Sequence, residues 1–252
     1  MLKELTKNDW MAWLKIPQEK IPGILILRGT RNLKTNYAKH KAYLKDVLEI
    51  GSPNGIFEDV CIGAYQNTLV AYASVYGDAM ASEITHVFGV LGTTHVIQTG
   101  CCGALSQEIL PGDIVCVTSA HSGEGAAQYY TPQKKEIQAT PDLVESIKNE
   151  WVNPVNLHKG RIWTTSALLA EGKEEIQNWN NYGYLAVDME TASTFAVAEH
   201  FGMKRLSLLF AFDNPFQGEH ILLSDVEKQE RRAKGEQVMM KIAFFLIQSS
   251  GQ

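Results

Sequence analysis

Short apolar runs alternate with longer stretches of helical period along most of the chain. Runs bounded by polar residues or glycine are typical of buried strands, and apolar residues at three- and four-residue spacing are typical of helices. The expected strands are Ile24–Leu27, Leu69–Val75, His95–Thr99, Asp113–Ser119, Val187–Met189 and Leu206–Phe212, and the expected helices are Tyr37–Leu48, Ala79–Gly89, Ala192–Phe201 and Asp225–Ile247. This alternation predicts an α/β fold, a mainly parallel sheet with helices on both faces.

Nothing in the sequence divides the chain into parts. It shows no Pro/Gly/Ser-rich linker, no block of charge and no internal repeat. We therefore expect one domain over residues 1–252, beginning with an N-terminal helical segment over residues 1–20.

Composition and charge exclude several classes of protein. Twenty-three Lys and Arg against 28 Asp and Glu give a net charge of −5, which argues against a nucleic-acid partner. No apolar run approaches the roughly 20 residues that span a bilayer, and the first residues lack a secretory apolar core, so we expect a cytoplasmic protein with no membrane partner. The four cysteines and seven histidines have neither disulfide-framework nor zinc spacing, so no metal is expected.

Three segments that follow predicted strands carry candidate chemistry, because ligands collect at the carboxyl ends of such strands. In the first, residues 98–104, Gly100 and Gly103 permit a tight turn beside a ligand. In the second, residues 187–192, Glu190 suits the two hydroxyls of a ribose, although an acid at a helix start also simply favours the helix dipole. In the third, residues 208–215, Asp213 is either a turn residue or a partly desolvated proton donor.

Taken together and in this order, these segments resemble the nucleoside phosphorylase and nucleosidase superfamily. The likeness runs from about Ile24 to Ile247 and is most specific over residues 99–115 and 186–192. It implies a nucleoside phosphorylase-like single domain with a central, mixed, partly barrel-like sheet. It also implies a small-molecule nucleoside substrate and a homo-oligomer, a dimer or a hexamer of dimers, in which a neighbouring subunit completes the active site.

The resemblance also implies roles for particular residues. Met189 and Glu190 match the pair that binds ribose, and Asp213 matches the acid that protonates a leaving purine. Arg232 falls at the spacing of the arginine that partners this acid in some members, although it could equally lie on a solvated helix face. The loop of residues 122–130 is similar to one that lies near base and sugar, so we expect the base to be bound by Glu124, Tyr129 and Phe212.

The nucleophile region departs from the family pattern. Phosphorolytic members carry an arginine at the position of Gln98 and a hydroxyl residue at that of Cys101. Here the candidate anion site is instead assembled from basic residues and side-chain-free backbone, namely Arg28, Gly29, Arg31, Lys34 and Gly100 together with Gln98 and Cys101. Hydrolytic members carry an uncharged amide-type residue at the position of Gln98, which resembles this chain. Those members also use a glutamate early in the chain to activate water, and residues 23–31 contain no acid here.

The sequence therefore predicts an enzyme that cleaves the N-glycosidic bond of a nucleoside, with a purine favoured by Asp213. Phosphorolysis, which yields free base and ribose 1-phosphate, leads narrowly. A nucleosidase that uses water is the first alternative, and a non-catalytic nucleoside-binding or storage protein is the second. No cofactor is expected, with inorganic phosphate as the candidate co-substrate.

Overall fold

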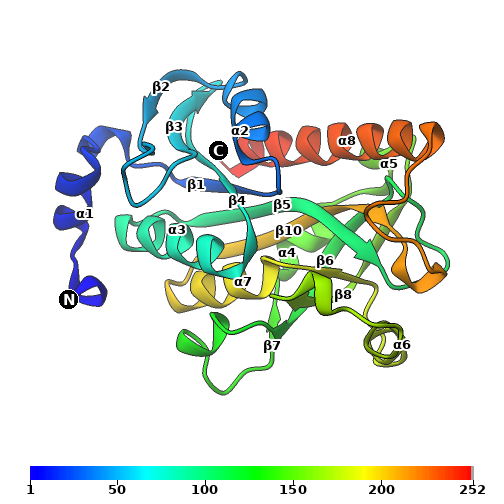
Figure 1. The fold of residues 1–252 in the computed structure, drawn as a ribbon. Helices are drawn as coiled ribbons and strands as arrows, with labels where there is room; N and C mark the ends of the chain where they lie inside the picture. Colours follow the sequence, from blue (N-terminus) through cyan, green and yellow to red (C-terminus); the bar gives the residue numbers. More distant parts are fainter. Residues whose placement is uncertain (251–252) are drawn as a thin grey trace.

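A computed structural model describes residues 1–250, with side chains through residue 247 (Figure 1). The strands are β1 Ile24–Gly29, β2 Lys45–Glu49, β3 Val60–Tyr65, β4 Thr68–Val75, β5 His95–Ala104, β6 Ile114–Gly123, β7 Glu136–Gln138, β8 Leu157–Thr165, β9 Ala186–Asp188 and β10 Lys204–Asp213. The α-helices are α1 Lys7–Leu14, α2 Leu33–Lys41, α3 Gly77–Leu91, α4 Pro141–Ser146, α5 Asn149–Val152, α6 Lys173–Asn181, α7 Thr191–His200 and α8 Val226–Ser250. Short 3₁₀ turns are η1 Leu2–Glu4, η2 Gln18–Lys20, η3 Ala127–Tyr129, η4 Leu168–Ala170 and η5 Pro215–Gln217.

The ten strands of the described residues form one mixed sheet, and part of it closes on itself. β5 pairs with β10, β10 with β6, β6 with β8, β8 with β9, and β9 pairs with β5 again. From this closed ring the sheet continues through β1, β4, β3 and β2 to an open edge. The predicted mixed, partly barrel-like α/β sheet is therefore confirmed.

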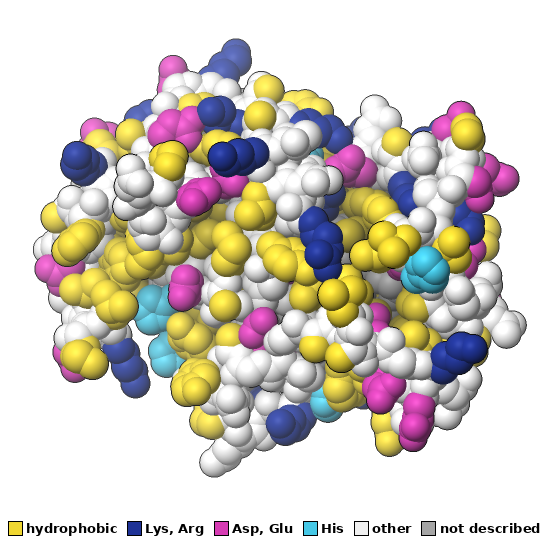
Figure 2. Space-filling view, viewed as in Figure 1, with side chains coloured by type: hydrophobic (Ala, Val, Ile, Leu, Met, Phe, Trp, Pro, Cys, Tyr) yellow, Lys and Arg dark blue, Asp and Glu magenta, His cyan; other side chains and the backbone are white. Residues whose placement is uncertain are grey.

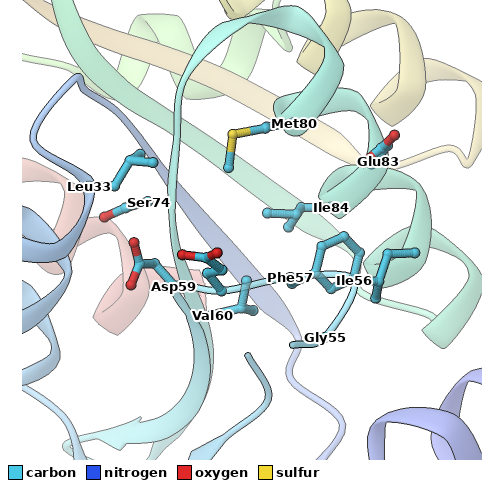
Figure 3. A pocket seen from close by; sticks show the side chains of 11 residues that line it. Leu33, Gly55, Ile56, Phe57, Asp59, Val60, Ser74, Met80, Glu83 and Ile84 are labelled. Atoms are coloured by element: carbon cyan, nitrogen blue, oxygen red, sulfur yellow. The ribbon is translucent and has the colours of Figure 1, made fainter. Parts of the chain in front are cut away.

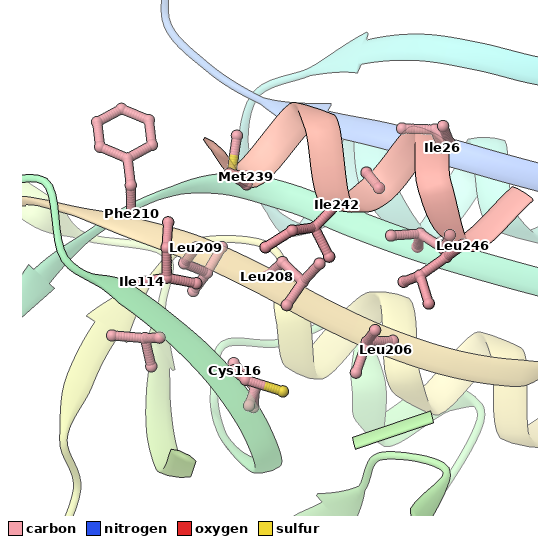
Figure 4. Close-up of a cluster of buried hydrophobic side chains, with 14 of the residues drawn as sticks. Ile26, Ile114, Cys116, Leu206, Leu208, Leu209, Phe210, Met239, Ile242 and Leu246 are labelled. Carbon is pink, nitrogen blue, oxygen red and sulfur yellow. The ribbon is translucent and has the colours of Figure 1, made fainter. Parts of the chain in front are cut away.

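Strand β1 shows why the fold needs helices on both faces. Its even-numbered residue Ile26 lies in the core cluster that contains Met239 and Ile242 of α8 (Figure 4). Its odd-numbered neighbours Leu25 and Leu27 lie in a second cluster with residues of α3. Because successive side chains of a strand point to opposite faces, an unbroken apolar run requires cover on both sides.

The predicted helix over residues 37–48 is wrong in its bounds. Helix α2 ends at Lys41, and residues Lys45–Glu49 form β2, which pairs antiparallel with β3. Leu44 is buried, and a Cβ at Gly63 would lie 2.8 Å from the Leu44 Cβ, so the chain lies directly on the neighbouring strand. Pairing with a strand that follows later in the chain overrides the local helical period here.

The turn expected at Gly100 and Gly103 is also absent, since β5 continues straight to Ala104. The parallel ladder with β10 runs through this segment as far as the pair of Asp213 and Gly103, and β9 joins from the other side at Gly103. Strands β3 and β8 escaped the sequence analysis, and β8 belongs to the closed ring.

The face shown in Figure 2 has lysine and arginine interspersed with aspartate, glutamate and apolar side chains. No tract of a single charge covers this face. Within the described residues, no helix has the length and apolar character needed to cross a membrane.

Candidate active site

The carboxyl ends of β1, β5 and β10 lie next to one another, and the start of α7 faces them. Cys101 lies in this region: burial raises the pKa of its thiol, and the charges of Arg28, Glu190 and Asp213 also act on it. The parallel register of β5 with both β1 and β10 produces this convergence, because it carries all three strands to the same edge.

Glu190 is only 4% exposed and is held by backbone rather than by another side chain. Its Oε1 accepts a hydrogen bond of 2.8 Å from the Gly77 N–H at the start of α3. Burial and the neighbouring Asp188 carboxylate raise the pKa of Glu190. A buried carboxyl group with spare acceptor capacity is well suited to bind hydroxyl donors.

Asp188 and Met189 precede Glu190 and differ from it in their contacts. The Asp188 carboxylate accepts from the hydroxyl of Thr164 at 2.7 Å and from the backbone N–H of Thr191 at 2.9 Å, so it fixes the first turn of α7. Met189, partly exposed, lies between the two acids in sequence. The structure therefore assigns the helix start to Asp188 and leaves Glu190 available.

The backbone of Gly29 lies directly against the Glu190 carboxylate. A Cβ at this position would lie 2.7 Å from Glu190 Oε2 and 3.0 Å from Gln98 Nε2, closer than packed atoms tolerate. A Cβ at Gly100 would meet the Gly29 carbonyl oxygen at 3.3 Å. Gly29 thus allows the end of β1 to approach the carboxylate, and Gly100 allows β5 to lie close to β1, with no side chain between them.

Asp213 ends β10 and is 5% exposed. Burial raises its pKa to about 6, and the nearby positive charge of Arg232 opposes part of that rise. Such a carboxyl group retains its proton closer to neutral pH than an exposed aspartate does, as proton donation requires.

Arg232 is buried, so it does not lie on a solvated helix face. It is 8% exposed, its guanidinium carbon lies 4.0 Å from the centre of the Phe212 ring, and it donates to the Phe212 carbonyl oxygen. A further hydrogen bond of 3.0 Å reaches Ser224 Oγ. Within the described residues no hydrogen bond or ion pair joins Arg232 to Asp213, so the two interact through their charges.

Arg28, the basic residue nearest the site, is already paired. It is 3% exposed, donates to Glu236 Oε1 at 2.8 Å and to the Gly29 carbonyl at 3.2 Å, and Glu236 also binds Lys39. Its Nε has no hydrogen-bond partner among the described residues. Arg28 therefore brings a guanidinium close to Glu190, but much of its charge is balanced by Glu236.

The other candidate anion residues differ in position. Gln98 is fully buried, accepts from the Thr194 hydroxyl at 3.2 Å and donates to the Thr99 carbonyl at 3.1 Å. Burial raises the pKa of the Cys101 thiol to about 11, so it is neutral at pH 7 and unsuited to nucleophilic attack. Arg31 lies at the surface, 4.7 Å from the centre of the Tyr76 ring, and Lys34 is exposed near Asp59. Arg28, Arg31 and Lys34 therefore point to different places and do not form one cluster of positive charge.

The expected base loop is only partly directed at this region. The Glu124 carboxylate is occupied within its own loop, where it accepts from Ser122 Oγ at 2.8 Å and from the Ala127 N–H at 3.1 Å. Tyr129 is 82% exposed, whereas Phe212 is partly buried beside Arg232. Of the three expected base contacts, Phe212 is the one that lies against Arg232.

Glu171 is a residue that the sequence analysis missed. It follows η4 in the connection after β8, and its buried Oε1 has no hydrogen-bond partner among the described residues. Burial raises the pKa of Glu171 to about 7, and the charge of Asp213 contributes to this rise. Its only signal in the sequence is an acid beyond a strand end, and that strand was itself not predicted.

Comparisons with known proteins agree with this arrangement. The family model of the phosphorylase superfamily matches residues 30–244. A guanosine phosphorylase from Halorubrum lacusprofundi is 32% identical over 117 residues, 45% of this chain and 48% of that protein, so the match spans about half its length. A purine nucleoside phosphorylase of the DeoD type from Vibrio parahaemolyticus is 25% identical over 211 residues, 81% of this chain and 84% of that protein.

A solved structure of uridine phosphorylase from Vibrio fischeri superposes with a TM-score of 0.78. It is 21% identical and covers 95% of this chain and 96% of that one, which establishes a common fold. The resemblance inferred from the sequence motifs is confirmed by the family match. The chain belongs to the phosphorylase superfamily.

Proposed function

We propose that this protein cleaves the N-glycosidic bond of a purine nucleoside and transfers the sugar to inorganic phosphate. The observation that carries the proposal is the buried Glu190 carboxylate facing the side-chain-free Gly29, with the proton-donating Asp213 in the same region. The names of the curated relatives, guanosine phosphorylase and purine nucleoside phosphorylase, support the same reaction class.

On the sugar side, Glu190 accepts hydrogen bonds from the two ribose hydroxyls. Positive charge develops on the sugar as the bond to the base breaks, so the buried carboxylate binds the transition state more strongly than the ground state. The Gly77 N–H holds one carboxylate oxygen in place before the substrate arrives.

On the base side, the electron pair of the breaking bond moves onto the purine, and Asp213 transfers a proton to a ring nitrogen. The base then leaves neutral, and the carboxylate left on Asp213 is stabilised by the charge of Arg232. Phe212 offers the base an aromatic neighbour, and Glu171 is a second acceptor for its N–H groups.

At the nucleophile, an oxygen of phosphate attacks the sugar carbon that the base leaves, which yields ribose 1-phosphate. Arg28 supplies positive charge beside Glu190, with Nε still able to donate. Hydrolysis is the second candidate, because Gln98 and Cys101 are neutral and Glu236 balances Arg28. A homo-oligomer belongs to the proposal, and the exposed Tyr129 gives a second copy an aromatic side chain to cover.

The deciding experiment measures base release from guanosine, inosine, adenosine and uridine, with and without phosphate, and identifies the sugar product. Phosphate-dependent release of a purine with ribose 1-phosphate supports the proposal. Free ribose formed without phosphate replaces phosphorolysis by hydrolysis. Binding of nucleosides with no base release from any of them would make the chain a binding protein.

A further inference from the structure

A cavity of about 340 Å³ lies outside the active site, and its lining shares no residue with that site. It is bounded by the start of α2, the loop before β3, the end of β4 and the first turns of α3 (Figure 3). Most of its wall is apolar and comes from Leu33, Ile56, Phe57, Val60, Met80 and Ile84.

Two buried polar side chains line the cavity. Asp59 is 9% exposed and Ser74 is fully buried, and in Figure 3 both lie at the same side of the cavity. Neither Asp59 Oδ2 nor Ser74 Oγ has a hydrogen-bond partner among the described residues. The Ser74 N–H donates to the Asp59 carbonyl at 3.0 Å, so the two residues lie opposite each other where β4 pairs with the chain entering β3. Buried polar atoms without partners cost stability, so two in one cavity point to a ligand that satisfies them.

The charges around the cavity select the sign of that ligand. Glu58 and Glu83 stand exposed at its rim, and Glu49 also adds negative potential at Asp59. Lys34 is the opposing charge, yet it makes no ion pair or hydrogen bond with Asp59 in the described part of the chain.

The Ser74 hydroxyl interacts with the Tyr72 hydroxyl, which also shares a 2.8 Å hydrogen bond with His40 Nδ1, and its lone pairs remain as acceptors. Arg28 is the cross-strand neighbour of Ser74, but its charge is balanced by Glu236. The carboxylates that line the cavity, Glu58, Asp59 and Glu83, therefore set its field, which disfavours an anion.

We propose that this cavity binds a small organic cation, an ammonium or guanidinium group on a short apolar stem. Asp59 and Ser74 accept the N–H hydrogens, and the apolar wall packs against the stem. The ratio of six apolar to two buried polar side chains fits this class of ligand. A bare metal ion is bound by several oxygen ligands and makes no use of an apolar wall. The same chemistry has two sources, a free amine or a lysine or arginine side chain of a second copy of this chain.

The first test titrates the protein with n-pentylammonium chloride by calorimetry, with 1-pentanol as the neutral probe of equal length. We expect the ammonium to bind and the alcohol to bind much more weakly. Asp59→Asn should weaken ammonium binding by about tenfold or more, since a charge-assisted hydrogen bond is lost. Ser74→Ala should weaken it less. Asp46→Asn is the matched control, because Asp46 is exposed outside the cavity and its positive φ of 49° suits asparagine.

The second test separates the two sources by sedimentation of the same variants. If no amine binds but Asp59→Asn dissociates an oligomer that Asp46→Asn leaves intact, the cation is a side chain of a second copy. Equal binding of ammonium and alcohol overturns the proposal. So does the absence of amine binding together with unchanged association of Asp59→Asn. Ser74→Ala provides the same comparison should Asp59→Asn fail to fold, and none of these readouts depends on catalysis.

Discussion

The candidate active site has an acid half, Glu190 and Asp213, and a basic half, Arg28. The two halves differ in how many of their charged groups already have a hydrogen-bond or ion-pair partner within the protein. Glu190 is buried against the Gly29 backbone with one backbone donor, and Asp213 interacts with Arg232 through charge, with no hydrogen bond between the two side chains among the described residues. Arg28 is equally buried but is bonded to Glu236. We therefore expect Glu190 and Asp213 to gain hydrogen-bond partners when a substrate binds. Arg28, in contrast, must bind any anion with a charge that Glu236 already balances. Substitutions on the two sides should consequently behave differently.

The largest effect is expected from Asp213→Asn, which removes the proton donor. Cleavage of purine nucleosides should fall by about 100- to 10,000-fold, the usual contribution of a general acid. A nitrophenyl riboside, whose leaving group needs no proton, should be spared. Equal losses on both substrates in steady-state assays would show that Asp213 is structural.

The same variant has a stability signature. The pKa of Asp213 is raised from 3.8 to about 6, so the folded protein binds the proton more tightly and wild-type stability falls as pH rises through that window. Asp213→Asn removes this dependence. Melting curves at pH 5 and pH 8 should therefore differ less for the variant than for the wild type.

Arg28→Ala tests the basic half. If phosphate is the acceptor, the loss of a buried guanidinium should cost about 3–5 kcal/mol and raise the phosphate requirement by roughly a hundredfold or more. Arg31→Ala is the control, because that arginine lies at the surface. Unchanged release of free ribose in phosphate-free buffer by Arg28→Ala would assign the enzyme to hydrolysis.

Removing Arg28 also leaves Glu236 without its buried ion-pair partner. A double variant is therefore needed to separate phosphate binding from stability. The double variant Arg28→Gln with Glu236→Gln keeps the buried charge balance while it removes the cation. It should melt close to the wild type and still lose phosphate affinity. Recovery of wild-type phosphate affinity in the double variant would show that the arginine serves only the fold.

Glu190→Gln should lower the rate constant by roughly ten- to a hundredfold, with a smaller effect on substrate binding. The cause is the loss of a charge-assisted hydrogen bond of about 1.5–3 kcal/mol that strengthens in the transition state. On a 2′-deoxynucleoside, which lacks one of the two hydroxyls, the same substitution should cost less. A full-size loss on that substrate would mean that Glu190 does not contact the diol.

The smallest effect concerns Glu219. The rate on purines should decline above about pH 6 as Asp213 loses its proton, and the nearby negative charge of Glu219 helps Asp213 to keep it. Glu219→Gln should shift this decline to lower pH, whereas Glu174→Gln, at an exposed position of α6, should not. A pH profile that is the same for both variants would show that the charge of Glu219 does not act on Asp213.

The positions of Glu190 and Asp213 at strand ends could be predicted from the sequence, because the pattern that marks them lies in the neighbouring residues. Glu190 and Asp213 each stand at the end of an apolar strand, and their neighbours in sequence already carry the pattern. The partners that define the geometry are distant: Gly77 lies 113 residues from Glu190, and Glu236 lies 208 residues from Arg28. No local pattern encodes such pairs, because the register of the sheet creates them.

The fold shows the same division. Strands buried on both faces were recognised from their apolar runs, but β2 is an exposed edge strand whose conformation depends on the neighbouring β3. The extension of β5 through Gly100 likewise depends on the ladder with β10. In both places, backbone pairing across the sheet outweighs the preference of the local sequence.

The closed ring of β5, β10, β6, β8 and β9 has a consequence for motion. Strand β5 has no free edge at Thr99, which pairs with β1 and β10, or at Gly103, which pairs with β9 and β10, so opening it at either position requires breaking hydrogen bonds on both sides at once. Amide hydrogens of residues 96–99 and 103 should then exchange with solvent only when the whole domain unfolds. Substrate must therefore enter and leave by movement of the surrounding loops and helix ends, while the strand floor beneath the reaction keeps its shape through every turnover.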